Sequence, residues 1–337
     1  MSALAKDLLS WFEKNGRKTL PWQSSPSNIY HVWLSEVMLQ QTQVATVIDY
    51  FEAFIRRFPT LPDLANADID DVLAQWAGLG YYSRARNLHK SANIVFSEFN
   101  GEFPLSFDDV TNLPGIGQST AGAVLSLGAK QRHPILDGNV KRVLSRYQQI
   151  EGHYGNASVL KTLWREADFH TPEHACPEYT QAIMDLGATV CTRSNPKCGA
   201  CPISKHCQAN LHQTQSQYPH KKPKKLKPTK STVMLVFRNE KGRVYLYKRP
   251  NKGIWGGLWS LIECADSAKA ITDTIRSHNA VAKVEKTLPQ FKHSFTHYHL
   301  LITPVLVSSP SITLGYENPS KLSKGVPAPV KKILSQL

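Results

Sequence analysis

A first group of residues that could carry out chemistry lies between positions 113 and 143. The turn 113–117 reads Leu-Pro-Gly-Ile-Gly, and Gly115 and Gly117 let its backbone take positive φ and approach a partner closely. A helix of small residues is predicted from Ser119, and the free N–H groups of its first turn form an anion site. Asp137 follows at the start of the next predicted helix. A phosphate-binding turn beside a positioned carboxylate indicates chemistry on a nucleic acid.

A second carboxylate, Glu36, lies inside an apolar helical pattern that runs over residues 30–58. The polar segment 40–43, Gln-Gln-Thr-Gln, falls in the middle of the same predicted helix. A carboxylate on an apolar face is costly unless it is paired or kept protonated. Two interpretations therefore remain from the pattern alone: a functional acid, or a partly exposed glutamate paired with Arg or Lys.

Four of the six cysteines are grouped in the spacing C-x6-C-x2-C-x5-C, at Cys191, Cys198, Cys201 and Cys207. Four thiolates in one short loop satisfy the ligand count of zinc or of a [4Fe–4S] cluster. A zinc ribbon usually pairs two C-x2-C knuckles, and this loop contains only one. The spacing therefore predicts a metal site and favours an iron–sulfur cluster over zinc.

The elements that must position these groups are predicted to be helical through the first two hundred residues, where alternating strand patterns are almost absent. Apolar residues recur at helical spacing over 4–16, 30–58, 69–76, 84–99, 157–169 and 175–190. Between two of these helices, Tyr81 and Tyr82 follow a glycine turn and precede Arg84. Such aromatic residues could stack on bases, or could form a buried tyrosine pair at a helix junction.

The composition changes after Cys207. Residues 217–230 contain six lysines and three prolines, which is typical of an extended, self-repelling connector. Beyond them, alternation with a period of two predicts a β-hairpin over 232–247, and a helix and two further strands follow. We therefore predict an all-α domain over 1–215, with its cluster loop at 191–207, a Lys/Pro-rich linker over 216–230, and an α+β domain over 231–337.

Size and charge agree with this organisation. The 337 residues predict about two domains, and the net charge of +14 suits a polyanionic partner. No apolar run approaches the roughly 20 residues that span a bilayer, and no secretory signal is recognisable at the start. We expect a cytoplasmic protein, associated with the nucleoid if it is bacterial, without a membrane partner.

Taken together, residues 1–210 resemble the helix-hairpin-helix DNA glycosylase superfamily, and within it the adenine-specific branch. The C-terminal half resembles the Nudix-like domain of that branch. The motifs that carry the resemblance are the hairpin L-P-G-I-G at 113–117, S-E-V-M-L-Q-Q-T at 35–42, G-L-G-Y-Y at 78–82, L-D-G-N-V at 136–140, the cysteine spacing, W-G-G-L-W at 255–259 and F-T-H at 295–297.

The resemblance implies a monomeric enzyme of base excision repair that removes adenine mispaired with 8-oxoguanine or guanine in duplex DNA, and that holds one [4Fe–4S] cluster. It implies that Glu36 is the general acid, that Asp137 stabilises the oxocarbenium-like sugar, and that Asn139 orients this site. It also implies three groups of contact residues. They are Gln41, Tyr81, Leu113, Gly115, Gly117 and Ser119 for DNA; Trp22, Gln23 and Gln181 for adenine; and Phe295, Thr296 and His297 for 8-oxoguanine.

Two departures from related patterns narrow the expected activity. Related lyases carry a lysine two residues after the hairpin glycine, where this chain has Ser119, so we expect base removal without efficient strand cleavage. A working Nudix hydrolase holds its metal ions with glutamates of an acidic helix, whereas the segment 267–278 of this chain offers Asp273 and no glutamate. The second domain should therefore recognise its ligand without hydrolysing it. The family usually has serine where this chain has Thr296. A bifunctional lyase and a nucleotide hydrolase are thus disfavoured, and a non-catalytic scaffold would have no need of Glu36.

Overall fold

The computed structural model describes residues 1–222, 226–310 and 315–337, and the chain forms two compact units. The first unit contains Met1–Asn66 and Asn87–Pro223, and the second contains Ala67–Arg86 and Lys224–Leu337. The segment 67–86 therefore folds with the C-terminal part of the chain. The predicted linker includes residues 223–225, which lie outside the described residues, and the predicted domain limits stay a prediction.

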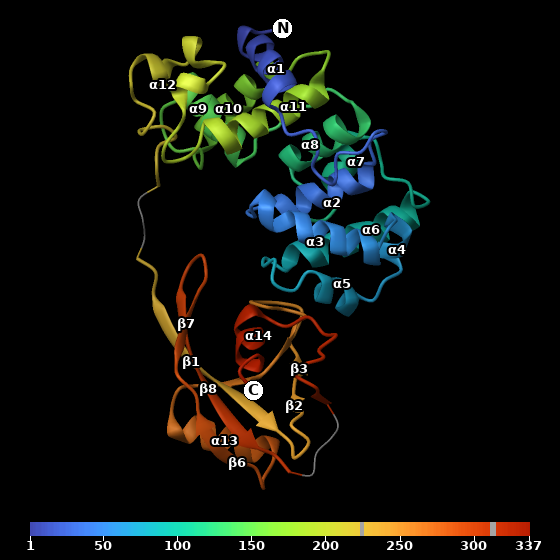
Figure 1. Cartoon of the computed structure of the whole chain (residues 1–337), viewed down its shortest axis with the longest axis vertical. Coiled ribbons are helices and arrows are strands. Elements are labelled where there is room, and N and C mark those ends of the chain that lie inside the picture. The colour runs from blue at the N-terminus through green and yellow to red at the C-terminus, as the bar shows by residue number, and fades with distance from the viewer. Residues whose placement is uncertain (223–225, 311–314) are drawn as a thin grey trace. The chain divides into compact units, whose positions relative to one another are not determined.

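Residues 1–222 contain only helical regular elements, which confirms the predicted fold class (Figure 1). The α-helices are α1 (Ala3–Asn15), α2 (Ile29–Leu39), α3 (Val44–Arg57), α4 (Leu61–Ala65), α5 (Ile69–Gln75), α6 (Ser83–Glu98), α7 (Phe107–Asn112), α8 (Gln118–Ala129), α9 (Gly138–Tyr147), α10 (Ala157–His170), α11 (Cys176–Asp185) and α12 (Gln208–Leu211). A π-helical turn, Leu186–Val190, continues α11, and the 3₁₀ turns Cys198–Ala200 and Ser204–His206 shape the cysteine loop.

The single helix predicted over 30–58 is wrong, because the chain breaks between α2 and α3. Gln41 adopts a left-handed conformation with φ 58°, which an α-helix cannot continue. The break coincides with the polar segment 40–43, whose side chains have no apolar face to bury. Glu36 is thereby placed in the last turn of α2, next to a bend instead of mid-helix.

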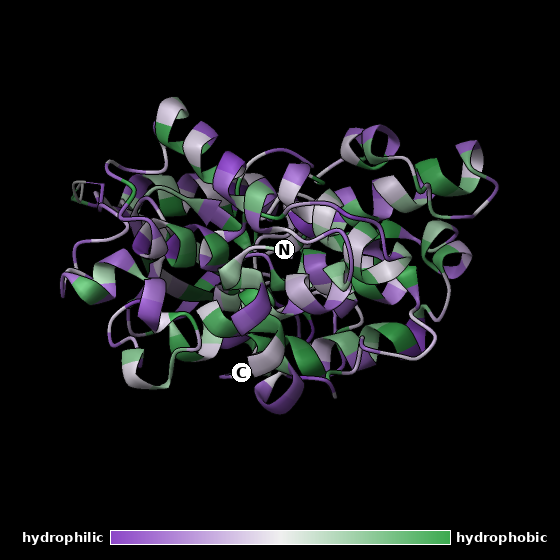
Figure 2. Ribbon diagram, turned by 90° about the horizontal axis from the view of Figure 1, so that it is seen from above, coloured by the Kyte–Doolittle hydropathy of each residue, from purple (hydrophilic) through white to green (hydrophobic). Residues whose placement is uncertain are grey.

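The first unit buries the apolar faces of its helices against one another. Leu4 and Leu8 of α1 pack with Leu144 of α9 and Ile183 of α11 in one core cluster. Figure 2 shows hydrophobic and hydrophilic residues alternating along the helices, as amphipathic helices require. None of the helices in the described part of the chain is long and apolar enough to cross a membrane.

The second unit is built on a seven-stranded sheet. Its central strands β1 (Thr229–Arg238) and β8 (His299–Ser308) pair in parallel along their whole length. The neighbouring strands pair with them in antiparallel fashion, or with each other at the edge: β2 (Val244–Tyr245), β5 (Ile262–Cys264), β6 (Lys283–Thr287), β7 (Phe291–Ser294) and β9 (Tyr316–Glu317). Strands β3 (Tyr247–Lys248) and β4 (Trp259–Ser260) form a separate pair.

Two helices cover opposite faces of this sheet. Along β1, Val233 and Leu235 pack with Ile275 of α13 (Ala268–His278), whereas Met234 and Val236 pack with Val330 of α14 (Ala328–Leu334). This alternation follows from the period of two along a strand. The predicted hairpin, helix and strands of this domain are confirmed, and α13 carries Asp273 as its acidic residue.

The segment 67–86 is tied to the C-terminal part of the second unit by polar contacts. Asp70 forms an ion pair with Lys248 at 2.7 Å and accepts a hydrogen bond from Trp259 Nε1 at 3.2 Å. Arg86 Nη1 donates to the carbonyl of Gly256 at 2.6 Å. These contacts explain why α5 belongs to the second unit.

Candidate active site and cysteine loop

A cavity of about 760 Å³ in the first unit gathers several of the predicted site residues. It lies between the end of α2, the break before α3, the start of α8, the segment before α9, and α11 with its π-turn. The predicted residues in its wall are Trp22, Glu36, Gln41, Ser119, Asp137, Asn139 and Gln181. The structure thus brings together residues that lie up to 159 positions apart, from 22 to 181.

Glu36 is half-buried in this wall, and its carboxyl forms no hydrogen bond or ion pair with the side chains of the described residues. Burial, with a further contribution from the negative charge of Asp137, raises the pKa of Glu36 to about 8. The alternative of a glutamate paired with Arg or Lys is not what the structure contains. Near neutrality Glu36 holds a proton that it can donate into the cavity.

Asp137 is the N-cap of α9 as well as part of the cavity. Its Oδ1 accepts from the Val140 N–H at 2.7 Å, and its Oδ2 accepts from Asn139 Nδ2 at 3.1 Å. Burial raises the pKa of Asp137, while these hydrogen bonds and the charge of Arg142 act in the opposite direction. The Glu36 carboxyl has no such hydrogen-bond donors, so it holds a proton more readily than the Asp137 carboxyl does.

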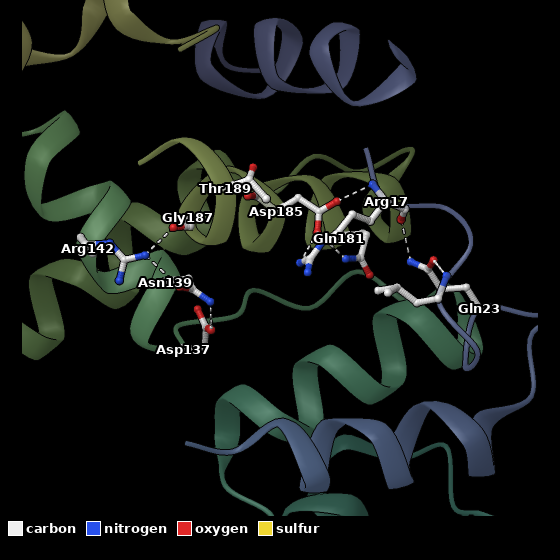
Figure 3. A network of polar contacts seen from close by, with 10 residues as sticks. Arg17, Gln23, Asp137, Asn139, Arg142, Gln181, Asp185, Gly187 and Thr189 are labelled. Carbon is white, nitrogen blue, oxygen red and sulfur yellow. Dashed lines mark hydrogen bonds and ion pairs between the residues drawn. The ribbon is translucent and has the colours of Figure 1, made fainter. Parts of the chain in front are cut away.

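Arg142 links this carboxylate to the cysteine loop. Its Nη2 donates to Asn139 Oδ1 at 2.8 Å and to the Gly187 carbonyl at 2.5 Å, and its Nε donates to the Cys191 carbonyl at 2.7 Å. Figure 3 shows this chain from Asp137 through Asn139 and Arg142 to Gly187. A Cβ added at Gly187 would lie 2.5 Å from Asn139 Cβ, so the π-turn approaches α9 closely only because this residue is glycine.

The hairpin between α7 and α8 has the positive φ expected at Gly115, but the same expectation is wrong for Gly117, because this residue begins α8 from an extended conformation. Gly115 has φ 81°, whereas Gly117 has φ −97° and caps α8 without a side chain, leaving open space above its Cα. The first-turn N–H groups of α8 are therefore accessible to an anion. The Leu113 side chain is buried, so contact with DNA at that position would have to use the backbone.

Ser119, two residues into α8, lies in the wall of the cavity with both carboxylates. Its hydroxyl accepts a hydrogen bond from the Leu136 N–H at 2.9 Å, directly before Asp137. A residue at this position thus reaches the cavity, and serine supplies no amine there.

The three predicted adenine contacts have different surroundings. Trp22 is buried, packs edge-on against Phe51 and lines the cavity. Gln181 lines the cavity and donates from Nε2 to Asp185. The Gln23 amide is bound to its own loop, accepting from Leu20 N–H and donating to the Arg17 carbonyl, and it lines a neighbouring pocket. The role of all three in binding adenine stays a prediction.

Two of the predicted DNA contacts, Gln41 and Tyr81, occupy left-handed positions on the surface. Gln41 and Tyr81 are exposed and have φ of 58° and 48°. Tyr82 is buried, so the two tyrosines do not form a core pair. Within the second unit, the Tyr81 hydroxyl lies 3.3 Å from Thr296 Oγ1.

Residues 295–297 form the tip of the turn between β7 and β8. Thr296 and His297 are exposed, and Phe295 is half-buried against Trp255, with ring centroids 5.2 Å apart. The Phe295 N–H donates to the Tyr298 carbonyl at 2.9 Å, which closes the turn. The tip offers a hydroxyl, an imidazole and aromatic faces to a ligand.

Cys191, Cys198, Cys201 and Cys207 line one small pocket, and none forms a disulfide. Arg146 is buried beside them, with Nη1 3.3 Å from Cys191 Sγ. Burial and the charges of the other three thiols raise the pKa of Cys201 to about 12, so four thiolates here require a cationic group between them. Among the described residues, no three His, Cys, Asp or Glu side chains lie close enough together to form a metal-ligand group. Four cysteine thiols around one pocket are nevertheless the ligands that an iron–sulfur cluster requires.

Arg17, Arg142 and Asp185 were missed by the sequence analysis. Asp185 is fully buried and bound by Arg17, with Nη2 and Oδ1 2.6 Å apart. An aspartate within an apolar helical face, four residues after a predicted site glutamine, was a signal that could have identified Asp185.

Comparison with known proteins agrees with this geometry. Residues 34–168 match the HhH-GPD superfamily of base excision DNA repair proteins, residues 191–207 match the iron–sulfur binding domain of endonuclease III, and residues 232–336 match the NUDIX domain. A thermostable thymine-DNA glycosylase shares the fold with a TM-score of 0.54 and 24% identity, over 62% of this chain and 95% of that one. The chain is therefore a helix-hairpin-helix DNA N-glycosylase with an iron–sulfur loop and a Nudix domain.

The chain is also similar to proteins named adenine DNA glycosylase. The one from Buchnera aphidicola of Schizaphis graminum is 39% identical over 97% of this chain and 96% of its own length. The one from Homo sapiens is 40% identical over 64% of this chain and 41% of its own length. The chain belongs to the adenine DNA glycosylase family.

Proposed function

We propose that the protein hydrolyses the N-glycosidic bond of adenine mispaired with 8-oxoguanine, or with guanine, in duplex DNA. The observation that carries this proposal is that Glu36 and Asp137 line one cavity with different surroundings, one without hydrogen-bond donors and one with several. The adenine must first leave the base stack, which costs a few kcal/mol and less in a mispair.

In the proposed reaction Glu36 is the acid. Because its pKa is raised to about 8, it can protonate N7 of the bound adenine near neutrality and make the base a better leaving group. Asp137, oriented by Asn139, stabilises the positive charge that develops on the sugar. Glu36, deprotonated by the first step, then accepts a proton from the attacking water, as in glycoside hydrolysis.

The reaction stops at base removal in this proposal. A lyase needs an amine at the sugar to form a Schiff base, and Ser119 occupies the cavity wall where the related enzymes place a lysine. The four cysteines of the loop would hold a [4Fe–4S] cluster, which would cross-link residues 191–207.

Recognition of the base opposite adenine is assigned to the second unit. Thr296 and His297 at the exposed turn tip present hydrogen-bonding groups, and Phe295 and Tyr81 present aromatic faces. With Asp273 and no glutamate on α13, the metal ligands of a working Nudix hydrolase are missing from that helix. We propose that this unit reads 8-oxoguanine without hydrolysing it, and that the protein acts as a monomer on duplex DNA.

The test is a duplex with adenine opposite 8-oxoguanine, incubated with the protein and assayed for free adenine and for strand breaks before and after alkali. We expect adenine release, with breaks that require alkali. Duplexes with A:G and A:T pairs measure specificity. Nicking without alkali as fast as base release would refute the monofunctional assignment, and equal rates on A:8-oxoG and A:T would refute the mispair specificity.

A further inference from the structure

Asp185 is the last residue of α11, and its carboxylate accepts four hydrogen bonds. The residue is 1% exposed. Its Oδ1 accepts from Arg17 Nε at 2.8 Å, from Arg17 Nη2 at 2.6 Å and from Gln181 Nε2 at 2.8 Å, and its Oδ2 accepts from the Arg17 N–H at 2.8 Å. Figure 3 shows Arg17 and Gln181 converging on this carboxylate from two sides.

This arrangement determines which way the Gln181 amide faces. Both Asp185 oxygens already accept hydrogen bonds from Arg17, so this carboxylate presents only acceptors to Gln181. Gln181 must therefore turn its NH₂ group toward Asp185, because the reverse orientation would bring a carbonyl oxygen against the carboxylate. The Gln181 carbonyl oxygen accepts no hydrogen bond from the described residues, and the side chain lines the cavity that holds Glu36 and Asp137.

A glutamine held in this way acts as a fixed acceptor. Adenine carries an amino group at C6, which donates, whereas guanine and hypoxanthine carry a carbonyl there, which accepts. A site built to receive a donor rejects a ligand that offers an acceptor, because two buried acceptors are then left unpaired.

We propose that Asp185, held by Arg17, is a positioning residue that sets Gln181 as a hydrogen-bond acceptor and so selects 6-aminopurines over 6-oxopurines. The inference rests on the proposed removal of adenine. Asp185 touches no substrate in this arrangement and acts only through the amide of Gln181.

The test compares single-turnover excision of adenine and of hypoxanthine, each placed opposite 8-oxoguanine. In Asp185→Asn the new amide can donate to Gln181 and turn its carbonyl away from the cavity. We expect the adenine-to-hypoxanthine rate ratio to fall about tenfold or more. Adding Gln181→Glu to Asp185→Asn restores an acceptor that faces the cavity, and the ratio should recover.

Controls separate this role from a structural one. Asp168→Asn removes a carboxylate paired with Arg132 at 2.9 Å, outside the cavity, and should leave the ratio unchanged. If Asp185→Asn does not fold, Gln181→Leu keeps the Arg17–Asp185 pair and should still lower the ratio. A ratio within about twofold of the native value in the folded variants overturns the inference. A native protein that releases no adenine overturns the proposed function instead.

Discussion

At the residue scale, the reactive property of Glu36 comes from what surrounds it. Its carboxyl is shielded by the wall of the cavity, has no hydrogen-bond donor of its own, and faces the negative charge of Asp137. Asp137 has the same kind of burial but receives two hydrogen bonds. These surroundings favour the proton on Glu36 over Asp137, as the proposed roles of an acid and a charge stabiliser require.

The pH dependence of excision follows from this difference. Glu36 must be protonated to act as an acid, and its pKa is raised to about 8, so the rate should be sustained near neutrality and fall as pH rises through about 8. Single-turnover rates of adenine release, measured across this pH range, show whether the rate falls in this way.

Glu36→Gln should remove excision and keep binding to the mispaired duplex. Excision near the native rate in that variant would contradict the assignment.

Substitution of Glu36 should change stability in the opposite direction to activity. The folded Glu36 carboxyl keeps its proton up to a pH of about 8, but the unfolded one loses it near 4.5. The folded state therefore binds more protons between these values, and the free energy of unfolding falls as pH rises through that window. Glu36→Gln cannot titrate, so we expect it to be more stable at pH 8 by ~1–3 kcal/mol. Urea unfolding at pH 5 and pH 8 measures the difference, which should be small at pH 5.

At the scale of elements, the site depends on interruptions of regular helix. The break at Gln41 ends α2 just after Glu36, and the π-turn after Asp185 brings the Gly187 carbonyl to Arg142. Helical periodicity predicted the helices but not the break over 40–43, because apolar spacing alone resumes in phase on its far side. The left-handed conformation of Gln41, an exposed residue, has no counterpart in the apolar pattern of the sequence.

Gly187 gives a direct test of how closely the π-turn approaches α9. Gly187→Ala places a Cβ 2.5 Å from Asn139 Cβ and 3.1 Å from its Cα, so Asn139 must move and Asp137 loses its alignment. We expect adenine release to slow by about tenfold or more, with DNA affinity changed much less. Gly138→Ala adds the same methyl group where nothing lies within 4 Å, and its loss should be smaller. Equal losses in the two variants would show that steric displacement is not the cause.

At the scale of the whole molecule, the two units share the chain in an unexpected way. The segment 67–86, which carries α5 and Tyr81, belongs to the unit built by the C-terminal sheet. Sequence order suggested a helical domain followed by a second domain, because composition changes mark a linker but say nothing of long-range partners. The polar contacts of Asp70 and Arg86 with residues 248–259 are visible only in the folded chain.

Truncation tests this sharing. A chain ended at residue 222 leaves Asp70 without Lys248 and Trp259, and Arg86 without the Gly256 carbonyl. We expect faster hydrogen exchange at the amides of α5 than in the full chain, and little change in α1 or α11, which pack on each other in the first unit. Equal protection of α5 in both chains would contradict its assignment to the second unit.

The sequence by itself determined the chemistry that is available: two carboxylates, a glycine hairpin, four cysteines at cluster spacing, and a serine where a lyase needs lysine. These are local properties, since spacing along the chain fixes which groups a turn or a loop presents. Only the tertiary structure decided what surrounds each group. Packing raised the pKa of Glu36 and brought Asn139, itself held by Arg142, into hydrogen-bond contact with Asp137. It also set the direction of the Gln181 amide through the Arg17–Asp185 pair. Local sequence can mark a carboxylate on an apolar face, but it does not name the partners of that carboxylate, because hydrogen bonds between distant segments exist only after the helices have packed.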